Sequence, residues 1–396
     1  MEWGARLVRR GEKRGGARMR LKTGRVGSFR GIELFAFGRE DRREWREWLQ
    51  GSGMHDFYQG PEFHGLAQGR GEGIARLYVL RDGDSSFGLP CLLRNLPFPV
   101  GHWRWDATSV RGYPGPWITG EGRGFPGRAL GALEEWLREE GVLTVFSLLN
   151  PVLGQARWLE GVGELRTLGR TVAMDLSGEE SEVWAGIRPS HRRGIRRLEE
   201  TGLWCGIEEP LRGFGDFALA YGETMARVGA GGSYLHGEEF FRELFAAHGE
   251  WMHLWLVRLG GAYGEVVGGA LFGEGSGIGE YYLSGTRDAW VGLSPMKKLL
   301  DAAWRWGRRR GWRYLHLGGG VGSEDSLFEF KAGFSPCRFP MSCWSWVLDG
   351  VVYGQCCRQA AAEWERGGWE VARRGFFPWY RSPVEIGAGL REGREP

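Results

Sequence analysis

Residues 315–334 read LHLGGGVGSEDSLFEFKAGF, and this stretch decides the fold. It predicts a short buried strand, a glycine-rich turn, and a helix that carries Leu327, Phe330 and Phe334 on one face. Successive glycines let the backbone adopt positive φ or approach a partner closely. The run is not a P-loop, because no Gly-Lys-Ser/Thr follows, and it lacks the dinucleotide-binding spacing. The unit therefore predicts a mixed α/β fold with Lys331 beside the glycines.

Upstream of this unit, the sequence predicts strands over 251–259, 265–272 and 277–284 and then a helix from 294 to about 310. Ser294 is expected to cap this helix, with Pro295 at its first position. Such a helix start attracts phosphate, and Arg287, Lys297 and Lys298 lie around it. Two interpretations are open: a bound polyphosphate offsets the unfavourable contact of the lysines with the helix dipole, or the lysines face water.

The order of predicted elements divides the chain into two similar α/β units. They cover 31–170 and 171–350, followed by an amphipathic helix and a loose end over 351–396. The likeness is one of element order, with no strong sequence repeat. Residues 1–30 carry ten bases against two acids. They predict a disordered basic tail, with a phosphate-binding arm as the alternative.

Composition narrows the function classes. The 396 residues carry a net charge of +3, from 52 bases and 49 acids, so we expect no general affinity for DNA or membranes. No apolar run approaches the roughly 20 residues that span a bilayer. The six cysteines show no metal-ligand spacing, so no metal is expected. We expect a cytoplasmic protein, with peripheral contact to the inner membrane face left open. Only five bases are Lys, and three of them lie between 297 and 331.

A basic helix and an aromatic loop are candidates for substrate binding. Arg192 and Arg196 fall on one helical face. They either contact phosphates of a substrate or form a solvated face that is partly offset by neighbouring acids. Tyr113 lies in a Trp-rich stretch, where aromatic rings stack on sugars or pack in a core.

Transfer of an acyl group to an amine requires a base near the amine and hydrogen-bond donors near the oxyanion. The candidate bases are Asp106, Asp325, Glu280 and His316. Three of them also have a structural interpretation: a turn cap for Asp106, a helix N-terminal acid for Asp325, and a packed histidine for His316. Tyr281 and Tyr282 alternate on a strand, so one faces the core and the other is free to face a site.

Several segments together resemble the FemAB-like (Fem peptidyltransferase-type) branch of the GNAT acyltransferase superfamily. They are LHLGGGVGSEDSLFEFKAGFSP from residue 315, the strand–helix–strand from 281 to 320, RPSHRRGIRRLEETGL from 188, YGETMARVGAGGSYLHGEEFFREL from 221, HDFYQGPEFHGLAQ from 55, LPCLLRNLP from 89 and DATSVRGYPGP from 106. The resemblance covers about residues 50–350. It implies two tandem GNAT-like domains, with the acyl donor held by the second domain.

The resemblance also implies roles for particular residues. The signature Lys of the family falls on Lys331, which is expected to assist the donor or the oxyanion, with Asp106 or Asp325 as the base. The expected donor-binding residues are Tyr282, Arg287, Ser294, Lys297, Lys298, Gly318, Gly319 and Gly320. The acceptor loop falls on 106–116, and Tyr113, Arg192 and Arg196 are the expected acceptor-binding residues. The usual GNAT pyrophosphate pattern is not intact, and no long coiled-coil arm is present.

The sequence therefore predicts an N-acyltransferase that moves an acyl group from acetyl-CoA or another acyl-CoA to an amino group. The expected acceptor is a small-molecule or lipid-linked precursor of the cell envelope or of a polysaccharide. One alternative is an aminoacyl-tRNA-dependent transferase that builds peptidoglycan cross-bridges, with tRNA as a partner. The other alternative is a non-catalytic glycan-binding module.

Overall fold

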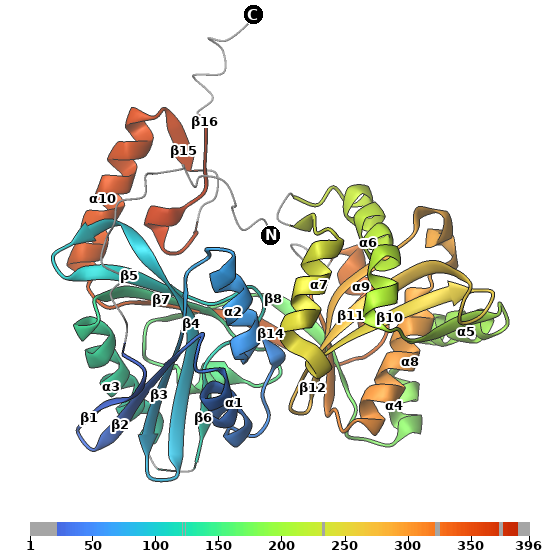
Figure 1. Ribbon diagram of the computed structural model, residues 1–396, viewed down its shortest axis with the longest axis horizontal. Helices are drawn as coiled ribbons and strands as arrows, with labels where there is room; N and C mark the ends of the chain where they lie inside the picture. Colours follow the sequence, from blue (N-terminus) through green and yellow to red (C-terminus); the bar gives the residue numbers. More distant parts are fainter. Residues whose placement is uncertain are drawn as a thin grey trace, which may run out of the picture.

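The computed structural model describes residues 22–120, 122, 124–231, 234–320, 325–371 and 375–386. Within these residues, fourteen strands join into one mixed sheet, and the last two, β15 and β16, form a separate two-stranded sheet. The order of the large sheet is β1-β2-β3-β4-β5-β7-β14-β8-β13-β12-β11-β10-β9, and β6 pairs with β4. Helices cover both halves of this sheet (Figure 1). The two α/β units predicted from the sequence are therefore present, but they share a continuous hydrogen-bonded sheet.

The first half consists of elements that precede residue 159. They are β1 (Gly24–Phe29), β2 (Ile32–Gly38), α1 (Arg42–Gly51), the 3-10 turn η1 (Phe57–Gln59), α2 (Pro61–Gly69), β3 (Ile74–Asp82), β4 (Ser85–Val100), β5 (Trp103–Thr108), β6 (Trp117–Thr119), α3 (Phe125–Glu139), β7 (Val142–Leu148) and η2 (Gln155–Trp158). The strand β1 lies inside the stretch 1–30, for which a disordered tail was predicted. That boundary is wrong for 24–29, because these residues pair with β2; residues 1–21 lie outside the described part of the chain.

The second half repeats the alternation of strands and helices. Its elements are β8 (Glu164–Asp175), α4 (Glu180–Gly186), α5 (Pro189–Glu199), β9 (Leu203–Ile207), α6 (Pro210–Arg227), α7 (Glu238–His248), η4 (Gly249–Trp251), β10 (Met252–Leu259), β11 (Glu265–Gly275), β12 (Ile278–Thr286), η5 (Asp288–Leu293), α8 (Met296–Arg309), β13 (Tyr314–Gly318) and α9 (Ser326–Ala332). Helix α8 buries one apolar face, including Leu299, Ala303 and Trp304, as expected for an amphipathic helix on a sheet.

The C-terminal segment returns to the first half. It contains β14 (Arg338–Val347), α10 (Gly350–Arg366), β15 (Trp369–Val371), η6 (Trp379–Arg381) and β16 (Val384–Ile386). Strand β14 pairs with β7 on one side and β8 on the other, and α10 lies against the first half (Figure 1). Trp344, Trp346 and Leu348 are buried in the core of the first half. The predicted second domain, 171–350, is therefore not one spatial unit, because its last strand, β14, packs into the core of the first half.

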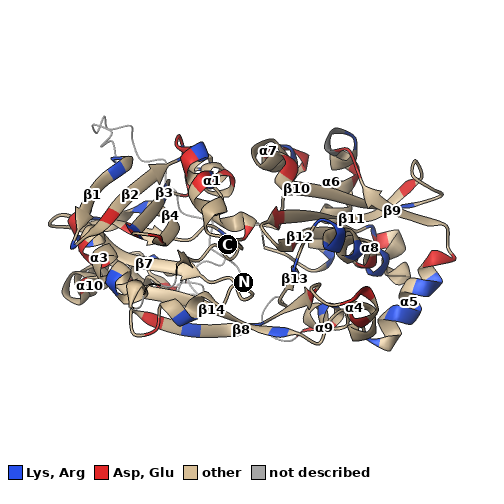
Figure 2. Ribbon diagram, turned by 90° about the horizontal axis from the view of Figure 1, so that it is seen from below, with Lys and Arg blue, Asp and Glu red and all other residues tan. Residues whose placement is uncertain are grey.

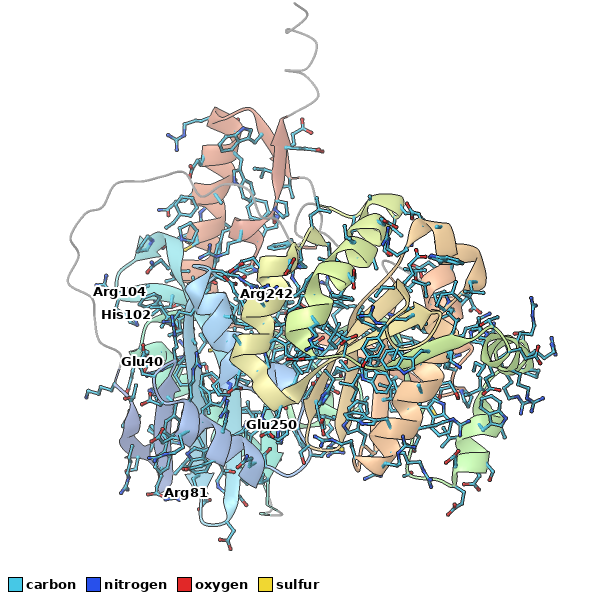
Figure 3. The ribbon with its side chains drawn as sticks, turned by 45° about the vertical axis from the view of Figure 1, so that its right-hand side comes forward. Glu40, Arg81, His102, Arg104, Arg242 and Glu250 are labelled. Carbon is cyan, nitrogen blue, oxygen red and sulfur yellow. The ribbon has the colours of Figure 1, made fainter. Side chains whose placement is uncertain are left out.

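The two halves are packed tightly against each other. One apolar cluster draws residues from both, including Trp45, Phe57, Phe217, Phe241 and Leu271. Helix α7, which carries the labelled Arg242, lies beside α2 at this seam (Figure 3). At Gly275 a Cβ atom would come 2.2 Å from the His55 carbonyl oxygen, so only glycine allows this approach. The contact places the segment before η1 directly on the end of β11.

Because β14 packs into the core of the first half, we expect its buried side chains to stabilise that half. Trp344→Ala should lower the free energy of unfolding by about 3–5 kcal/mol, because it removes a fully buried indole and its bond to the Val162 carbonyl. Urea denaturation would measure the loss. The exposed Val351→Ala in α10 is the control and should change little. Equal effects of the two substitutions would contradict the packing described.

Candidate active site

The centre of the site lies where two parallel strands separate. β12 and β13 pair through Ile278↔Tyr314, Gly279↔Leu315 and Glu280↔His316, and the ladder stops there. The pairing of β12 with β11 skips Tyr282, and that of β13 with β8 skips Leu317, so both strands bulge just beyond this point. The opening beyond the carboxyl ends of parallel strands is a common ligand site in α/β sheets, and bulges often re-aim side chains there. Glu280 and His316 are thus the last paired residues before the opening.

A pair of carboxyl groups joins the two halves at this point. Asp56, just before η1, is 0% exposed, and Glu280 on β12 is 2% exposed. Asp56 and Glu280 act on each other's pKa, so the two carboxyl groups are electrostatically coupled. Burial, and then the negative charge of Glu280, raise the pKa of Asp56 well above its usual range. Burial raises the pKa of Glu280 to about 8. Burial therefore favours the protonated form of both groups, and Glu280 becomes a carboxylate of unusually high basicity as pH rises toward 8.

Asn150 fixes Asp56 from the first half of the chain. Its Nδ2 donates to Asp56 Oδ2 at 2.5 Å. Its Oδ1 accepts from the backbone N–H groups of Val152 and Leu153 at 2.9 and 3.2 Å, which sets the orientation of the amide. The first half of the chain therefore holds Asp56 through its Oδ2 atom.

His316 is the third member of the cluster. Its Nδ1 lies 2.9 and 2.7 Å from the two carboxylate oxygens of Glu280. Burial lowers the pKa of His316 to about 4, so the imidazole is neutral and Nδ1–H donates to the carboxylate. The ring of Tyr113 meets it edge-on, with centroids 5.2 Å apart. His316 thus orients Glu280 and connects it to the first-half loop that carries Tyr113.

Lys331 supplies the positive charge. It is 9% exposed, and its Nζ donates to the Gly319 carbonyl oxygen at 2.7 Å. Burial lowers its pKa to about 8, while Asp325 and Glu280 favour the charged form. A Cβ on Gly318 would lie 3.4 Å from Lys331 Nζ and 4.0 Å from the Tyr113 hydroxyl. An ammonium has three N–H donors, so Lys331 has donors beyond the one bound to Gly319.

A row of tyrosines connects this cluster to a cavity. Tyr58 lies 5.9 Å, between ring centroids, from both Tyr113 and Tyr282. Tyr282 in turn lines a cavity of about 290 Å³ between the two halves. The other lining residues come from α2, the loop before Tyr113 and the region of α7: Phe63, Leu66, Ala67, Arg70, Glu72, Val110, Arg111, His236, Phe240 and Leu244. The cavity combines aromatic walls with two guanidinium groups, which suits part of an anionic organic molecule.

The structure brings together only some of the residues predicted from the sequence. Lys331, Gly318, Gly319 and Tyr113 meet at the cluster, and Tyr282 lines the cavity. Gly320 directly precedes residues 321–324, which lie outside the described part. Glu280 and His316, which the sequence offered as candidate bases, occupy the centre.

Two predicted catalytic acids have structural roles. Asp106 is buried, with Oδ1 bound to Arg94 and Oδ2 to Arg381 at 2.6 Å, so both oxygens already have guanidinium partners. The assignment of Asp106 as the base is therefore wrong; it anchors η6 to β5. Asp325 accepts from the Phe328 N–H at 2.9 Å as the N-cap of α9. Its contribution to Lys331 is the charge that favours the ammonium form.

The predicted donor-binding residues around α8 are arranged differently from the expectation. Arg287 is bound to Glu223, with Nε and Oε1 2.7 Å apart. Ser294 has a left-handed backbone, with φ 54°, and no side-chain hydrogen bond caps α8, so the predicted Ser294 cap is wrong. Lys297 lies against Gly194 of α5. Lys298, the next residue in the first turn of α8, is half-buried.

Arg192 and Arg196 lie on α5, which packs against α8. Figure 2 shows basic residues along α5, at the outer end of the second half. The guanidinium of Arg196 lies over the Trp184 ring at 6.0 Å. The prediction that these arginines bind the acceptor together with Tyr113 is therefore not supported, because they belong to the helix beside Lys297.

Sequence reasoning missed Asp56 and Asn150. Both come from the first half, about 95 residues apart, and each reads as an ordinary turn residue. The available signal was Asp56 directly before Phe57 and Tyr58, within a segment already matched to the family pattern. Glu280 was identified, but its partner was not.

Within the described residues, no group of three or more His, Cys, Asp or Glu side chains is placed to hold a metal ion. No helix in this part of the chain has the length and apolar character needed to cross a bilayer.

Comparisons with known proteins address the fold and the family. Residues 185–331 match the acetyltransferase (GNAT) domain family. FemX has a similar crystal structure, with a TM-score of 0.64 and 13% identity over 82% of this chain and 99% of that chain. A conserved protein of unknown function from Bacteroides thetaiotaomicron VPI-5482 matches with a TM-score of 0.50 and 12% identity, over 78% of this chain and 98% of that one. No curated protein sequence matches the chain.

The carboxyl pair makes the stability of the protein depend on pH. Glu280 has a pKa of about 8 in the folded protein, which is above that of an unfolded glutamate. Its contribution to the free energy of unfolding is therefore fully present below about pH 4.5 and is lost as pH rises through 8. Relative to the wild type, Glu280→Gln should therefore become more stable as pH rises from 5 to 8, by up to about 1.4 kcal/mol per pH unit. Urea denaturation at several pH values would measure the difference.

The exposed Glu250, labelled in Figure 3, gives the matched control. Glu250→Gln should leave the pH dependence of unfolding as it is in the wild type. If the free energy of unfolding of the wild type and of Glu280→Gln changed with pH in parallel, Glu280 would have an ordinary pKa in the folded protein, and the prediction would be wrong.

Proposed function

We propose a function for a chain that carries a GNAT acetyltransferase domain over residues 185–331 on the tandem fold of FemX. It is an N-acyltransferase of the FemAB-like type that moves an activated acyl group to an amino group of a cell-envelope or polysaccharide precursor. The GNAT match and the FemX-like fold agree with the resemblance found in the sequence and support the acyltransferase assignment.

One observation carries the proposal: Glu280, a carboxyl group of raised pKa, and Lys331, a buried ammonium, act on each other's charge where β12 and β13 stop pairing. An amine must lose a proton as it attacks an acyl carbonyl, and the carboxylate form of Glu280, which grows as pH approaches about 8, accepts that proton. The attack forms a C–N bond, and the C–S or C–O bond to the carrier then breaks. Lys331 N–H groups stabilise the negative charge that develops on the carbonyl oxygen during the attack.

The 290 Å³ cavity supports the acceptor part of the proposal. Arg70 and Arg111 are positioned to attract a phosphate or carboxylate of the acceptor. Burial raises the pKa of Glu72, while both arginines counter that effect, so the three groups act on one another. Envelope precursors carry such anionic groups together with an amine. Tyr282 and Tyr58 form the wall between this cavity and the reacting centre.

The region of α5 and α8 is the proposed donor side. Lys297 lies against α5, and Arg188 and Lys297 both act on His191, which bonds to the Phe330 carbonyl next to Lys331. An anionic carrier held here would deliver its acyl group toward Lys331. Acetyl-CoA or another acyl-CoA is the first candidate. The further basic residues along α5, Arg193, Arg196 and Arg197, favour the alternative carrier, aminoacyl-tRNA, because its phosphates extend farther.

The test is to assay the purified protein with acetyl-CoA and with aminoacyl-tRNA and to follow carrier release with amine acceptors. With whichever donor the wild type uses, Lys331→Ala should lower kcat/KM by about tenfold or more while the protein stays folded. The reason is that this substitution removes the positive charge at the oxyanion. Exposed Lys22→Ala is the control. Near wild-type turnover of Lys331→Ala would remove this lysine from the mechanism. Saturable glycan binding without turnover of either donor would instead favour the non-catalytic module.

Donor binding should depend on salt through the basic helix. Arg192→Ala combined with Arg196→Ala should raise the KM for the donor by about three- to tenfold at low ionic strength and flatten its salt dependence, because exposed charges are screened by salt. Donor KM would be measured between low and physiological salt. The exposed Arg43→Ala in α1 serves as the control for a general change in charge. An unchanged donor KM at low salt would contradict the assignment of α5 to the donor.

A further inference from the structure

Two buried glutamines make the same pair of hydrogen bonds on either side of one loop. Gln59 is 0% exposed and Gln155 is 1% exposed. Gln59 Oε1 accepts from the Asp56 N–H at 3.0 Å, and Gln155 Oε1 accepts from the Asn150 N–H at 2.6 Å. On the other side, Gln59 Nε2 donates to the Gly115 carbonyl at 3.3 Å, and Gln155 Nε2 donates to the Pro114 carbonyl at 3.3 Å. Gln59 thus connects the segment of Asp56 to Gly115, and Gln155 connects the segment of Asn150 to Pro114.

The loop at 114–115 is seated directly on these amides. Gly115 has φ 46°, and a Cβ there would come 1.8 Å from Gln155 Oε1, so no larger residue fits. Its N–H donates to the Leu148 carbonyl at 3.1 Å, which ties the loop to the end of β7. Tyr113, whose ring meets His316, is the residue just before Pro114. A shift of the loop would therefore move Tyr113 relative to His316.

We propose that Gln59 and Gln155 are positioning residues for the proposed acyl transfer. They hold Tyr113 against His316 and hold the segments of Asp56 and Asn150 in the register that places Asp56 on Glu280. The inference rests on the proposed function for its catalytic consequence, but the geometry that it describes is independent of the reaction. An amide is required because only it accepts and donates at once; a carboxylate only accepts, and an apolar side chain does neither.

The catalytic effect should be large although neither glutamine contacts the reacting atoms. Displacement of a catalytic group by about 1 Å can cost about 100-fold in rate. Loss of one amide releases one side of the loop, while the backbone bond from Gly115 to Leu148 remains. We therefore expect kcat to fall by about tenfold or more in Gln59→Met and in Gln155→Met, with KM values within about threefold of the wild type.

Gln68 offers a matched control. It also accepts a backbone bond, from the Ala75 N–H at 2.8 Å, but it connects α2 to β3 rather than to the acid pair. Gln68→Met should lower the urea midpoint without a change in kcat. The second pair of variants, Gln59→Glu and Gln155→Glu, keeps the acceptor and loses the donor when the carboxylate is ionised. A buried glutamic acid regains the donor when protonated, so the kcat of these variants relative to that of the wild type should rise as pH falls.

The deciding readout does not require turnover. In the full-length protein, the imidazole signals of His316, assigned with His316→Gln, report the edge-on ring of Tyr113 in proton and nitrogen NMR spectra. Both Met variants should shift these signals, and Gln68→Met should leave them in place. Unchanged His316 signals in folded Gln59→Met and Gln155→Met would overturn the inference, as would wild-type kcat in both. If the wild type turns over no donor, the proposed function fails, and the His316 signals still decide the positioning role.

Discussion

Two carboxyl groups from different halves of the chain are buried against each other, and the site depends on this contact. Burial raises the pKa of both carboxyl groups, and that of Glu280 reaches about 8. The neutral His316 donates to Glu280, and the Lys331 ammonium lies close enough to favour the charged form of Glu280. These opposing effects act among side chains that are buried from water. They make Glu280 a base that becomes available as pH rises toward 8.

The contact persists because the two halves are not separate bodies joined by a linker. Strands β8 and β14 pair with each other over Arg338–Ser345, with one register shift, and connect the two parts of the sheet. The apolar cluster around Phe57, Phe217 and Leu271 closes the opposite side of the seam. Opening the halves would break strand hydrogen bonds and expose a packed core, which is costly. Rearrangements during the reaction are therefore not expected in the relative position of the halves.

The reacting centre lies between two different surroundings. On one side, the cavity with Arg70 and Arg111 has aromatic walls and the exposed Glu72, which suits a compact anionic acceptor. On the other side, α5 carries the exposed Arg193, Arg196 and Arg197 on the helix that contacts Lys297, which suits a larger polyanion. The buried Tyr58 contacts the partly buried Tyr113 and Tyr282. The two substrates would then meet only at the end of β12 and β13.

Local patterns in the sequence determined the strand–glycine–helix unit around Lys331, the amphipathic α8 and the tandem α/β order, because period, turn residues and caps act over a few residues. The family pattern identified Lys331 and the glycines for the same reason. The sequence did not reveal that Asp106 has two arginine partners, one of them 275 residues away at Arg381. Nor did it reveal the pairing of Asp56 with Glu280 or the return of β14 to the first half. These features depend on which distant segments become neighbours when apolar surface is buried, and only the tertiary structure decides that.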